Sequence, residues 1–386
     1  MSALIDLDHA ATTAVRPEVS DAMAPFAAGD YGNPSGAHRI ARTAVRALDE
    51  ARERAAAVLG CAPGDLVLTS GGTESDNQAV TGGMPPRPGT PVCSAAEHHA
   101  VLDVVEALGG CVVPVDGTAR IDLTALEAEL VRLGASDRPA SVVSVMLANN
   151  EVGTVTDLGA VRAVLDRSAP GVPLHTDAVQ AAAWLDLAEH AAPADLVSVS
   201  AHKLGGPKGV GALVVRPSTT IRPLLLGGGQ ERGRRSGTVN VAGAVGLAVA
   251  LELTAAERAA TCDRVGALRD RLADGLRAAV DGLVETVVPD GDRRHVLPGT
   301  CHVCIPGVDS EMLLLLLEGD GVCASAGSSC SSGAAARSHV VVACGVADDL
   351  AAGAVRLTLG RSSTGADVDA VLSALPAAVA RLRGRA

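Results

Sequence analysis

Lysine is almost absent from this chain, and the two lysines that remain lie close together. Lys203 and Lys208 are the only lysines among 32 basic residues, and both fall in the stretch Ser200 to Gly209. Arginine supplies positive charge equally well, but only lysine offers a primary amine that can deprotonate. A lysine kept in a glycine-rich turn therefore suggests covalent chemistry, most often a Schiff base with pyridoxal phosphate. Compositional drift toward arginine would leave the same pattern, so other residues must decide.

The composition bounds the size and class of the protein. With 386 residues, 48% of them hydrophobic, the chain can build more than one domain, or one large domain with a smaller one appended. The net charge of −12 argues against a nucleic-acid-binding surface, and no apolar run is long enough to predict a membrane span. The first residues carry no signal-like apolar run and the nine cysteines are scattered, so we expect a cytoplasmic protein without a disulfide framework. Cys301 and Cys304 fall in a predicted strand that points them to opposite faces, so no metal site is expected.

Helix-like and strand-like segments alternate from about residue 35 to residue 217. The predicted strands cover residues 65–70, 91–95, 111–115, 141–147, 172–176, 194–199 and 210–215. The predicted helices cover residues 41–59, 98–109, 122–134 and 157–168. Short buried strands separated by helices predict an α/β fold with a mainly parallel sheet, whose ligands bind beyond the carboxyl ends of the strands.

A second α/β region follows a long helical connector over residues 239–280. Its predicted elements are a strand (299–305), a helix (309–318), a short strand (321–324), a Ser/Gly/Ala-rich loop (325–338), a strand (354–359) and a closing helix (366–383). We therefore predict a large domain over residues 15–255. We assign residues 1–14 and 256–386 to a small domain, which carries the loop with Cys330.

Polar residues follow five of the predicted strands in the larger region. They are Ser70–Thr73, Glu97–His99, Asn149–Gly153, His175–Gln180 and Ser200–Lys203. An aldehyde cofactor needs these residue types: an amine, a carboxylate, amides, a flat ring, and small hydroxyls at a helix start for a phosphate. Each residue taken singly has an ordinary role, such as Asp177 as a helix cap or Asn150 as a turn former. Their joint arrival at successive strand ends favours the cofactor site.

The same motifs resemble those of a known enzyme family. His175-x-Asp177-x-x-Gln180 and Ser200-x-His202-Lys203 are similar to motifs of the class V, fold-type I pyridoxal-phosphate enzymes. The resemblance is closest to the cysteine desulfurases of the NifS/IscS type, and it rests on residues 7–13, 32–35, 69–77, 97–98, 149–153, 227–232, 235–238 and 355–361. It covers essentially the whole chain. It implies a fold-type I transferase with a mainly parallel large domain and a smaller C-terminal α/β domain.

The resemblance also implies a role for each matching residue. Lys203 would hold the cofactor and move the Cα proton, His98 would stack on the ring and act as acid or base, and Cys330 would accept sulfur. The implied contacts are Asp177 with the ring nitrogen, Asn150 and Gln180 with the phenolic oxygen, Gly72, Thr73, Ser200 and His202 with the phosphate, Thr238 with the phosphate of the neighbouring subunit, and Arg356 with Asn33 on the substrate carboxylate.

The reaction implied by the resemblance converts L-cysteine to L-alanine and leaves the sulfur on Cys330 as a persulfide, for delivery by a homodimer to an acceptor protein. Small residues surround Cys330, as a mobile sulfur carrier requires. One departure is Ala334–Arg337, where the family commonly has a Leu-Glu-Pro-like stretch, and this puts partner docking in question. Cys323 is a second candidate thiol.

Other functions stay open on the sequence alone. Another class V enzyme, an aminotransferase or one like the selenocysteine lyases, would use the same cofactor site, and a degenerate fold would serve as a scaffold. The cysteine on a Gly/Ser loop argues against the first, and intact Lys203, Asp177 and His98 argue against the second. The sulfur could go to iron–sulfur cluster assembly, to tRNA or DNA thiolation, or to a metabolite. We expect no membrane partner and no direct contact with nucleic acid.

Overall fold

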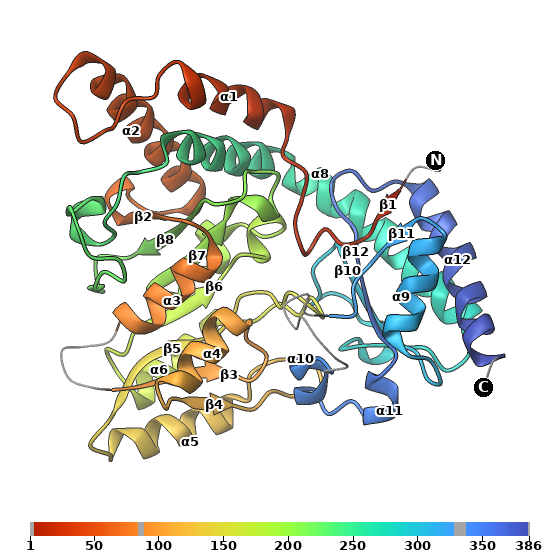
Figure 1. Cartoon of the computed structure of the whole chain (residues 1–386). Coiled ribbons are helices and arrows are strands. Elements are labelled where there is room, and N and C mark those ends of the chain that lie inside the picture. The colour runs from red at the N-terminus through yellow and green to blue at the C-terminus, as the bar shows by residue number, and fades with distance from the viewer. Residues whose placement is uncertain (1–3, 84–88, 328–336, 385–386) are drawn as a thin grey trace.

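A seven-stranded sheet forms the centre of the larger lobe in the computed structural model, which describes residues 4–83, 89–327 and 337–384 (Figure 1). Its strands are β2 (Leu66–Thr69), β3 (Thr90–Ser94), β4 (Cys111–Val113), β5 (Ala140–Ser144), β6 (Leu174–Asp177), β7 (Leu196–Ser200) and β8 (Gly211–Val215). They lie in the order β2-β8-β7-β6-β5-β3-β4, and all pairs from β7 to β4 are parallel. Only β8 is reversed, since it is antiparallel to both β7 and β2. The carboxyl ends of the other strands therefore share one edge, and the predicted mainly parallel α/β fold is confirmed.

Helices cover both faces of this sheet. They are α1 (Pro17–Ala28), α2 (Arg39–Leu59), α3 (Gly72–Gly82), α4 (His99–Ala107), α5 (Leu123–Gly134), α6 (Leu158–Ser168), α7 (Leu187–His190) and α8 (Val241–Ala279). Strand β5 shows that both faces of the sheet are buried. Its adjacent residues Val142 and Val143 point to opposite faces, and both are fully buried, in different apolar clusters. One cluster joins β5 to α2, α5, α6 and α8, and the other joins it to α3 and α4.

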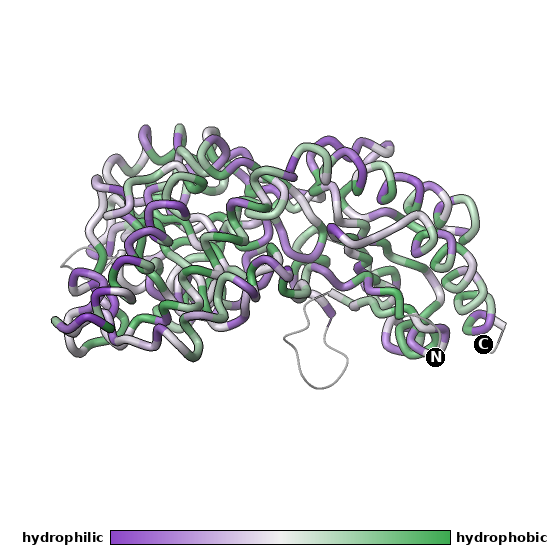
Figure 2. The backbone as a smooth tube through the Cα atoms, turned by 90° about the horizontal axis from the view of Figure 1, so that it is seen from above, coloured by the Kyte–Doolittle hydropathy of each residue, from purple (hydrophilic) through white to green (hydrophobic). Residues whose placement is uncertain are grey.

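A second apolar core lies beside the first. It packs the antiparallel sheet β12-β10-β9 against α9, α12 and the second half of α8. The elements are β1 (Ile5–Asp6), β9 (Val284–Glu285), β10 (Thr300–Cys304), α9 (Ser310–Gly319), β11 (Val322–Cys323), α10 (His339–Ala343), α11 (Asp348–Ala351), β12 (Ala354–Thr358) and α12 (Gly365–Arg383). Seen from above, the two lobes lie side by side (Figure 2), and α8 runs from one into the other (Figure 1). Within the described ranges no helix, α8 included, is long and apolar enough to cross a bilayer.

Three details differ from or refine the predicted elements. Helix α1 has no predicted counterpart, because prolines at its first position and at Pro25 obscure its helical pattern. Strand β6 starts and ends later than the predicted strand 172–176, so Asp177 is its last residue rather than the residue after it. Cys301 and Cys304 contact different apolar clusters, as their alternation on β10 predicts.

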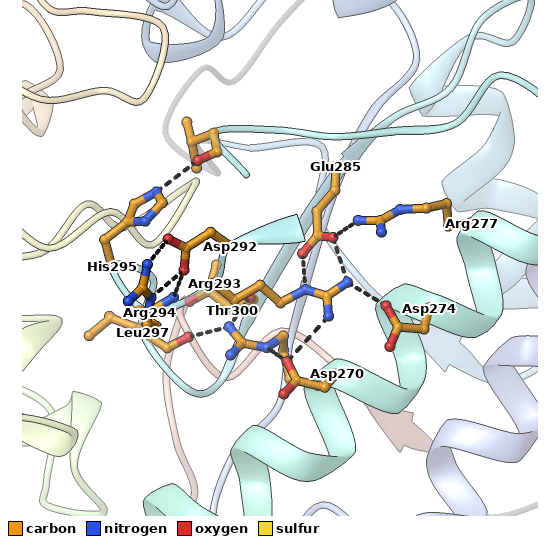
Figure 3. A network of polar contacts seen from close by, with 12 residues as sticks. Asp270, Asp274, Arg277, Glu285, Asp292, Arg293, Arg294, His295, Leu297 and Thr300 are labelled. Atoms are coloured by element: carbon orange, nitrogen blue, oxygen red, sulfur yellow. Dashed lines mark hydrogen bonds and ion pairs between the residues drawn. The ribbon is translucent and has the colours of Figure 1, made fainter. Parts of the chain in front are cut away.

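A network of ion pairs fixes the segment that links α8 to β10 (Figure 3). The buried Glu285 carboxylate accepts two hydrogen bonds of 2.7 Å from Arg293 and one of 2.6 Å from Arg277. Arg293 also donates to Asp274 of α8, at 2.7 Å. The same segment pairs with the turn that bears Asn150, since the Val155 N–H donates to the His295 carbonyl and the Leu297 N–H to the Gly153 carbonyl, both at 2.8 Å. The network therefore helps to hold the turn that bears Asn150 in place.

We expect the substitution Arg293→Met to lower the free energy of unfolding by about 3 kcal/mol, because it leaves the buried Glu285 with the half-exposed Arg277 as its remaining partner. Chemical denaturation of the purified protein measures this difference. The matched control is Arg294→Met, which removes the neighbouring arginine, 90% exposed and paired with Asp292 at the surface. Equal stability of the two variants would show that the buried pair contributes nothing.

Candidate active site

A cavity of about 280 Å³ lies at the edge of the sheet where β2, β5, β6 and β7 end. It brings together the predicted residues Gly72, Thr73, His98, Asn150, Asp177, Gln180, Ser200, His202, Lys203 and Arg356. They come from strand ends, helix starts and turns that are far apart in the sequence, and from β12 of the second lobe. The common direction of the strands explains the gathering, because parallel strands present their carboxyl ends, and the loops that follow them, at one edge.

Three predicted site residues are not among the residues that line this cavity. Asn33 is exposed, and its side chain accepts a hydrogen bond from the Ser35 N–H at 2.9 Å. Thr238 is also exposed. Cys330 lies outside the described residues. The roles of these three therefore remain predictions.

Lys203 sits in the short 3-10 turn Ala201–Lys203, which follows β7 directly. Its Nζ donates to the carbonyls of Ala10 and Ala11, at 2.5 and 2.9 Å. The N-terminal segment thus holds the amine at one wall of the cavity. Gln180 also binds this segment, because its Nε2 donates to the same Ala10 carbonyl at 2.8 Å. An amide nitrogen carries two hydrogens, so Gln180 keeps one for a ligand.

The start of α3 offers an anion site to the same cavity. Gly71 precedes the helix with φ of 152°, a backbone conformation that favours glycine. Gly72 and Thr73 are the first helical residues. Their N–H groups have no intrahelical acceptor, so an anion such as a phosphate binds there favourably. Ser200 and His202 line the cavity with them. Burial, with nearby lysines, lowers the pKa of His202 to about 4, so it meets an anion as a neutral ring.

Asp177 and His98 supply a buried acid and a neutral ring. Burial raises the pKa of the Asp177 carboxyl, while His98 and Lys203 act in the opposite direction. A positively charged ring nitrogen beside Asp177 would therefore be stabilised as its ion-pair partner. Burial lowers the pKa of His98, and its Nδ1 accepts from the Ala100 N–H at 3.1 Å, which leaves the proton on Nε2.

Asp76 is a cavity residue that the sequence analysis did not single out. It lies on α3, one turn beyond Gly72 and Thr73, and is 1% exposed. Burial first, and then the neighbouring Asp177 carboxyl, raise the pKa of the Asp76 carboxyl well above its usual range. The helical spacing of three to four residues from the phosphate turn was the signal that could have found it.

Pyridoxal phosphate fits the polar atoms that this cavity leaves unsatisfied. Ser200 Oγ and Asn150 Oδ1 are buried and have no hydrogen-bond partner within the described part of the chain. Buried polar atoms without partners are costly, so a ligand that bonds to them is stabilised. An amine on one wall, an acid on another and an anion site at a helix start match the aldehyde, the ring nitrogen and the phosphate of this cofactor.

Comparisons with known proteins identify the family of the chain. The family model described as aminotransferase class-V matches residues 5–371. An IscS-like cysteine desulfurase from Mycobacterium tuberculosis is 42% identical over 98% of this chain and 96% of its own. Among solved structures, a NifS-like protein superposes with a TM-score of 0.88 at 34% identity, covering 98% of this chain and all of its own. The structure titled SspA in complex with cysteine gives 0.76 at 29% identity, over 92% and 98% of the two chains. The chain therefore belongs to the class V aminotransferase family and, within it, to the cysteine desulfurases.

Proposed function

We propose that this chain converts L-cysteine to L-alanine with pyridoxal phosphate held by Lys203, and that Cys330 takes the sulfur as a persulfide. The observation that carries the proposal is the single cavity in which an amine, a buried acid, an anion site and an arginine converge. Pyridoxal phosphate, when bound, acts as an electron sink for the bonds at the substrate Cα.

Each wall of the cavity would hold one part of the cofactor. Asp177 would pair with the ring nitrogen, and His98 would stack on the ring. The amides of Asn150 and Gln180 would bond the phenolic oxygen. The phosphate would take the start of α3, with Gly72, Thr73, Ser200 and His202 around it. Arg356 would bind the substrate carboxylate, a task that suits a guanidinium because it donates two parallel hydrogen bonds.

The chain's own groups then move the protons and the sulfur. Lys203 Nζ takes the proton from the substrate Cα, since a neutral amine is a general base. The thiolate of Cys330 bonds to the substrate sulfur as the carbon–sulfur bond breaks. One carbon–sulfur bond is lost and one sulfur–sulfur bond is gained. The electron pair of the broken bond takes up a proton at Cβ, which gives the methyl group, and the proton taken by Lys203 returns to Cα to complete alanine.

The product ratio tests this function against the other class V reactions. With L-cysteine and a thiol reductant, we expect alanine and sulfide in equal amounts, because the reductant cleaves the persulfide. Amino acid analysis and sulfide determination on the same samples measure the ratio. A keto acid in place of alanine would instead point to a transaminase or an elimination enzyme. A strong preference for selenocysteine would point to a selenocysteine lyase-like activity.

We also propose that the active protein is a homodimer. Leu224, Leu225 and Leu226 are 42, 41 and 85% exposed and lie in the loop that leads to Thr238. Exposed apolar residues gathered in this way are typical of protein interfaces. Such an interface would bring Thr238 to the phosphate of the neighbouring subunit. Light scattering of the cofactor-loaded protein distinguishes a dimer from a monomer.

The remaining parts of the proposal concern organisation and context. We place the boundary between the large domain (15–255) and the small domain (1–14 and 256–386) within α8, which contacts the first core up to Leu253 and the second from Val265. A cytoplasmic location is supported by the cysteines of the described ranges, all of which are free thiols. The sulfur acceptor is proposed to be a protein.

A further inference from the structure

The Arg356 guanidinium is held from two sides before any substrate arrives. It lines the cavity from β12, and its side chain is 3% exposed. Nη1 donates to the Asn150 carbonyl at 2.9 Å, and Nη2 donates to Asp8 Oδ1 at 2.8 Å. Its Nε is buried and has no hydrogen-bond partner in the described ranges. A buried N–H without an acceptor is costly, so Nε is available to an incoming carboxylate.

Asp8 reaches this guanidinium from outside the cavity. It is not among the cavity-lining residues, and its side chain is 27% exposed. The backbone around it is fixed, because the Thr358 N–H donates to the Leu7 carbonyl at 2.7 Å and the Asp8 N–H donates to Asp6 Oδ1 at 2.9 Å. Asp8 therefore holds a carboxylate against the Arg356 guanidinium from a position that does not line the cavity.

We propose that Asp8 is a positioning residue that aims Arg356 at the substrate carboxylate and, through its own charge, limits how tightly that carboxylate binds. The proposal rests on the function proposed above, in which Arg356 receives the carboxylate of cysteine. Asp8 would act in two ways. Its oxygen orients Nη2, which favours binding. Its negative charge repels the carboxylate of the substrate across the buried Arg356 guanidinium, which disfavours binding.

Two substitutions separate the two effects. Asp8→Asn keeps an oxygen that accepts from Nη2 but removes the charge, so we expect the KM for L-cysteine to fall about five-fold, with kcat within about two-fold of the wild type. Asp8→Ala removes the charge and the oxygen together, so its KM should exceed that of Asp8→Asn by at least about ten-fold. A merely structural role would not lower KM in the conservative variant.

The experiment measures KM and kcat for the cofactor-loaded wild type, both Asp8 variants, Arg356→Ala and Asp6→Asn. Asp6→Asn is the matched control, because it removes the charge of an exposed carboxylate that does not contact Arg356 but keeps the oxygen that accepts from the Asp8 N–H. Affinity for L-alanine, read from the absorbance of the bound cofactor, should follow KM. A KM for Asp8→Asn that is unchanged or higher, with a raised KM for Arg356→Ala, would refute the role of Asp8 alone. An unchanged KM for Arg356→Ala would refute the carboxylate site itself.

Discussion

Replacing Lys203 by alanine is expected to reduce alanine formation from L-cysteine by at least about a thousand-fold. The reason is the position of its amine, which the Ala10 and Ala11 carbonyls hold at the wall of the cavity, where it can act as a base. His98 is the other cavity group that can take a proton, but burial lowers its pKa, which weakens it as a base. Initial rates of alanine release, with cofactor in excess, measure the loss.

The control for this prediction is built into the sequence. Lys208 is the only other lysine, it is exposed, and it does not line the cavity. Lys208→Ala should therefore keep the wild-type rate. Borohydride reduction of the yellow protein, followed by peptide mass spectrometry, should find the cofactor on Lys203. A trapped cofactor on Lys208, or full activity in Lys203→Ala, would overturn the assignment of the amine.

Replacing Cys330 by serine is expected to lower the turnover of L-cysteine to below about 1% of the wild-type rate while the cofactor still binds. A hydroxyl is a far weaker nucleophile than a thiolate and cannot carry a persulfide. The cofactor contacts proposed above do not involve Cys330, so the absorbance of the bound cofactor should not change. Alanine release and the absorption spectrum, measured on the same preparation, separate sulfur transfer from cofactor binding.

Cys323 is the matched control for Cys330. It ends the short strand β11, and burial together with Asp6, Glu318 and Asp8 raises the pKa of its thiol. The thiolate of Cys323 is therefore scarce at neutral pH, which makes it a poor sulfur acceptor. Cys323→Ser should have nearly the wild-type rate. A large loss in this variant together with normal turnover in Cys330→Ser would exchange the roles of the two cysteines.

Most of the cavity was predictable from short-range patterns. Apolar runs located the strands, and the rule that parallel strands present their carboxyl ends together placed Lys203, Asp177, Asn150 and His98 in one site. The structure confirms that these residues share a cavity. Their chemical roles came from the resemblance to a family, because a cavity-lining aspartate or histidine alone does not specify which atom of a ligand it meets.

The contributions of the N-terminal segment could not be predicted in the same way. Asp8 and Arg356 are 348 residues apart in sequence, and Lys203 is 193 residues from the carbonyl of Ala10 that holds it. No periodicity or turn motif encodes a contact over that separation, since it depends on how the two lobes pack. Asn33 and Thr238 are a different case, because neither lines the cavity, so the roles that the resemblance implies for them remain predictions, and Thr238 is proposed to act on a partner subunit.

The most direct test of the central claim is to locate the sulfur after a single exposure to L-cysteine. The purified, cofactor-loaded protein is mixed with L-cysteine, alkylated without reductant and digested, and every cysteine peptide is examined by mass spectrometry. We expect one extra sulfur atom on the peptide that contains Cys330, in proportion to the alanine formed, and none in Lys203→Ala. Alanine formation with the extra sulfur on Cys323, or with no persulfide on any cysteine, would contradict it.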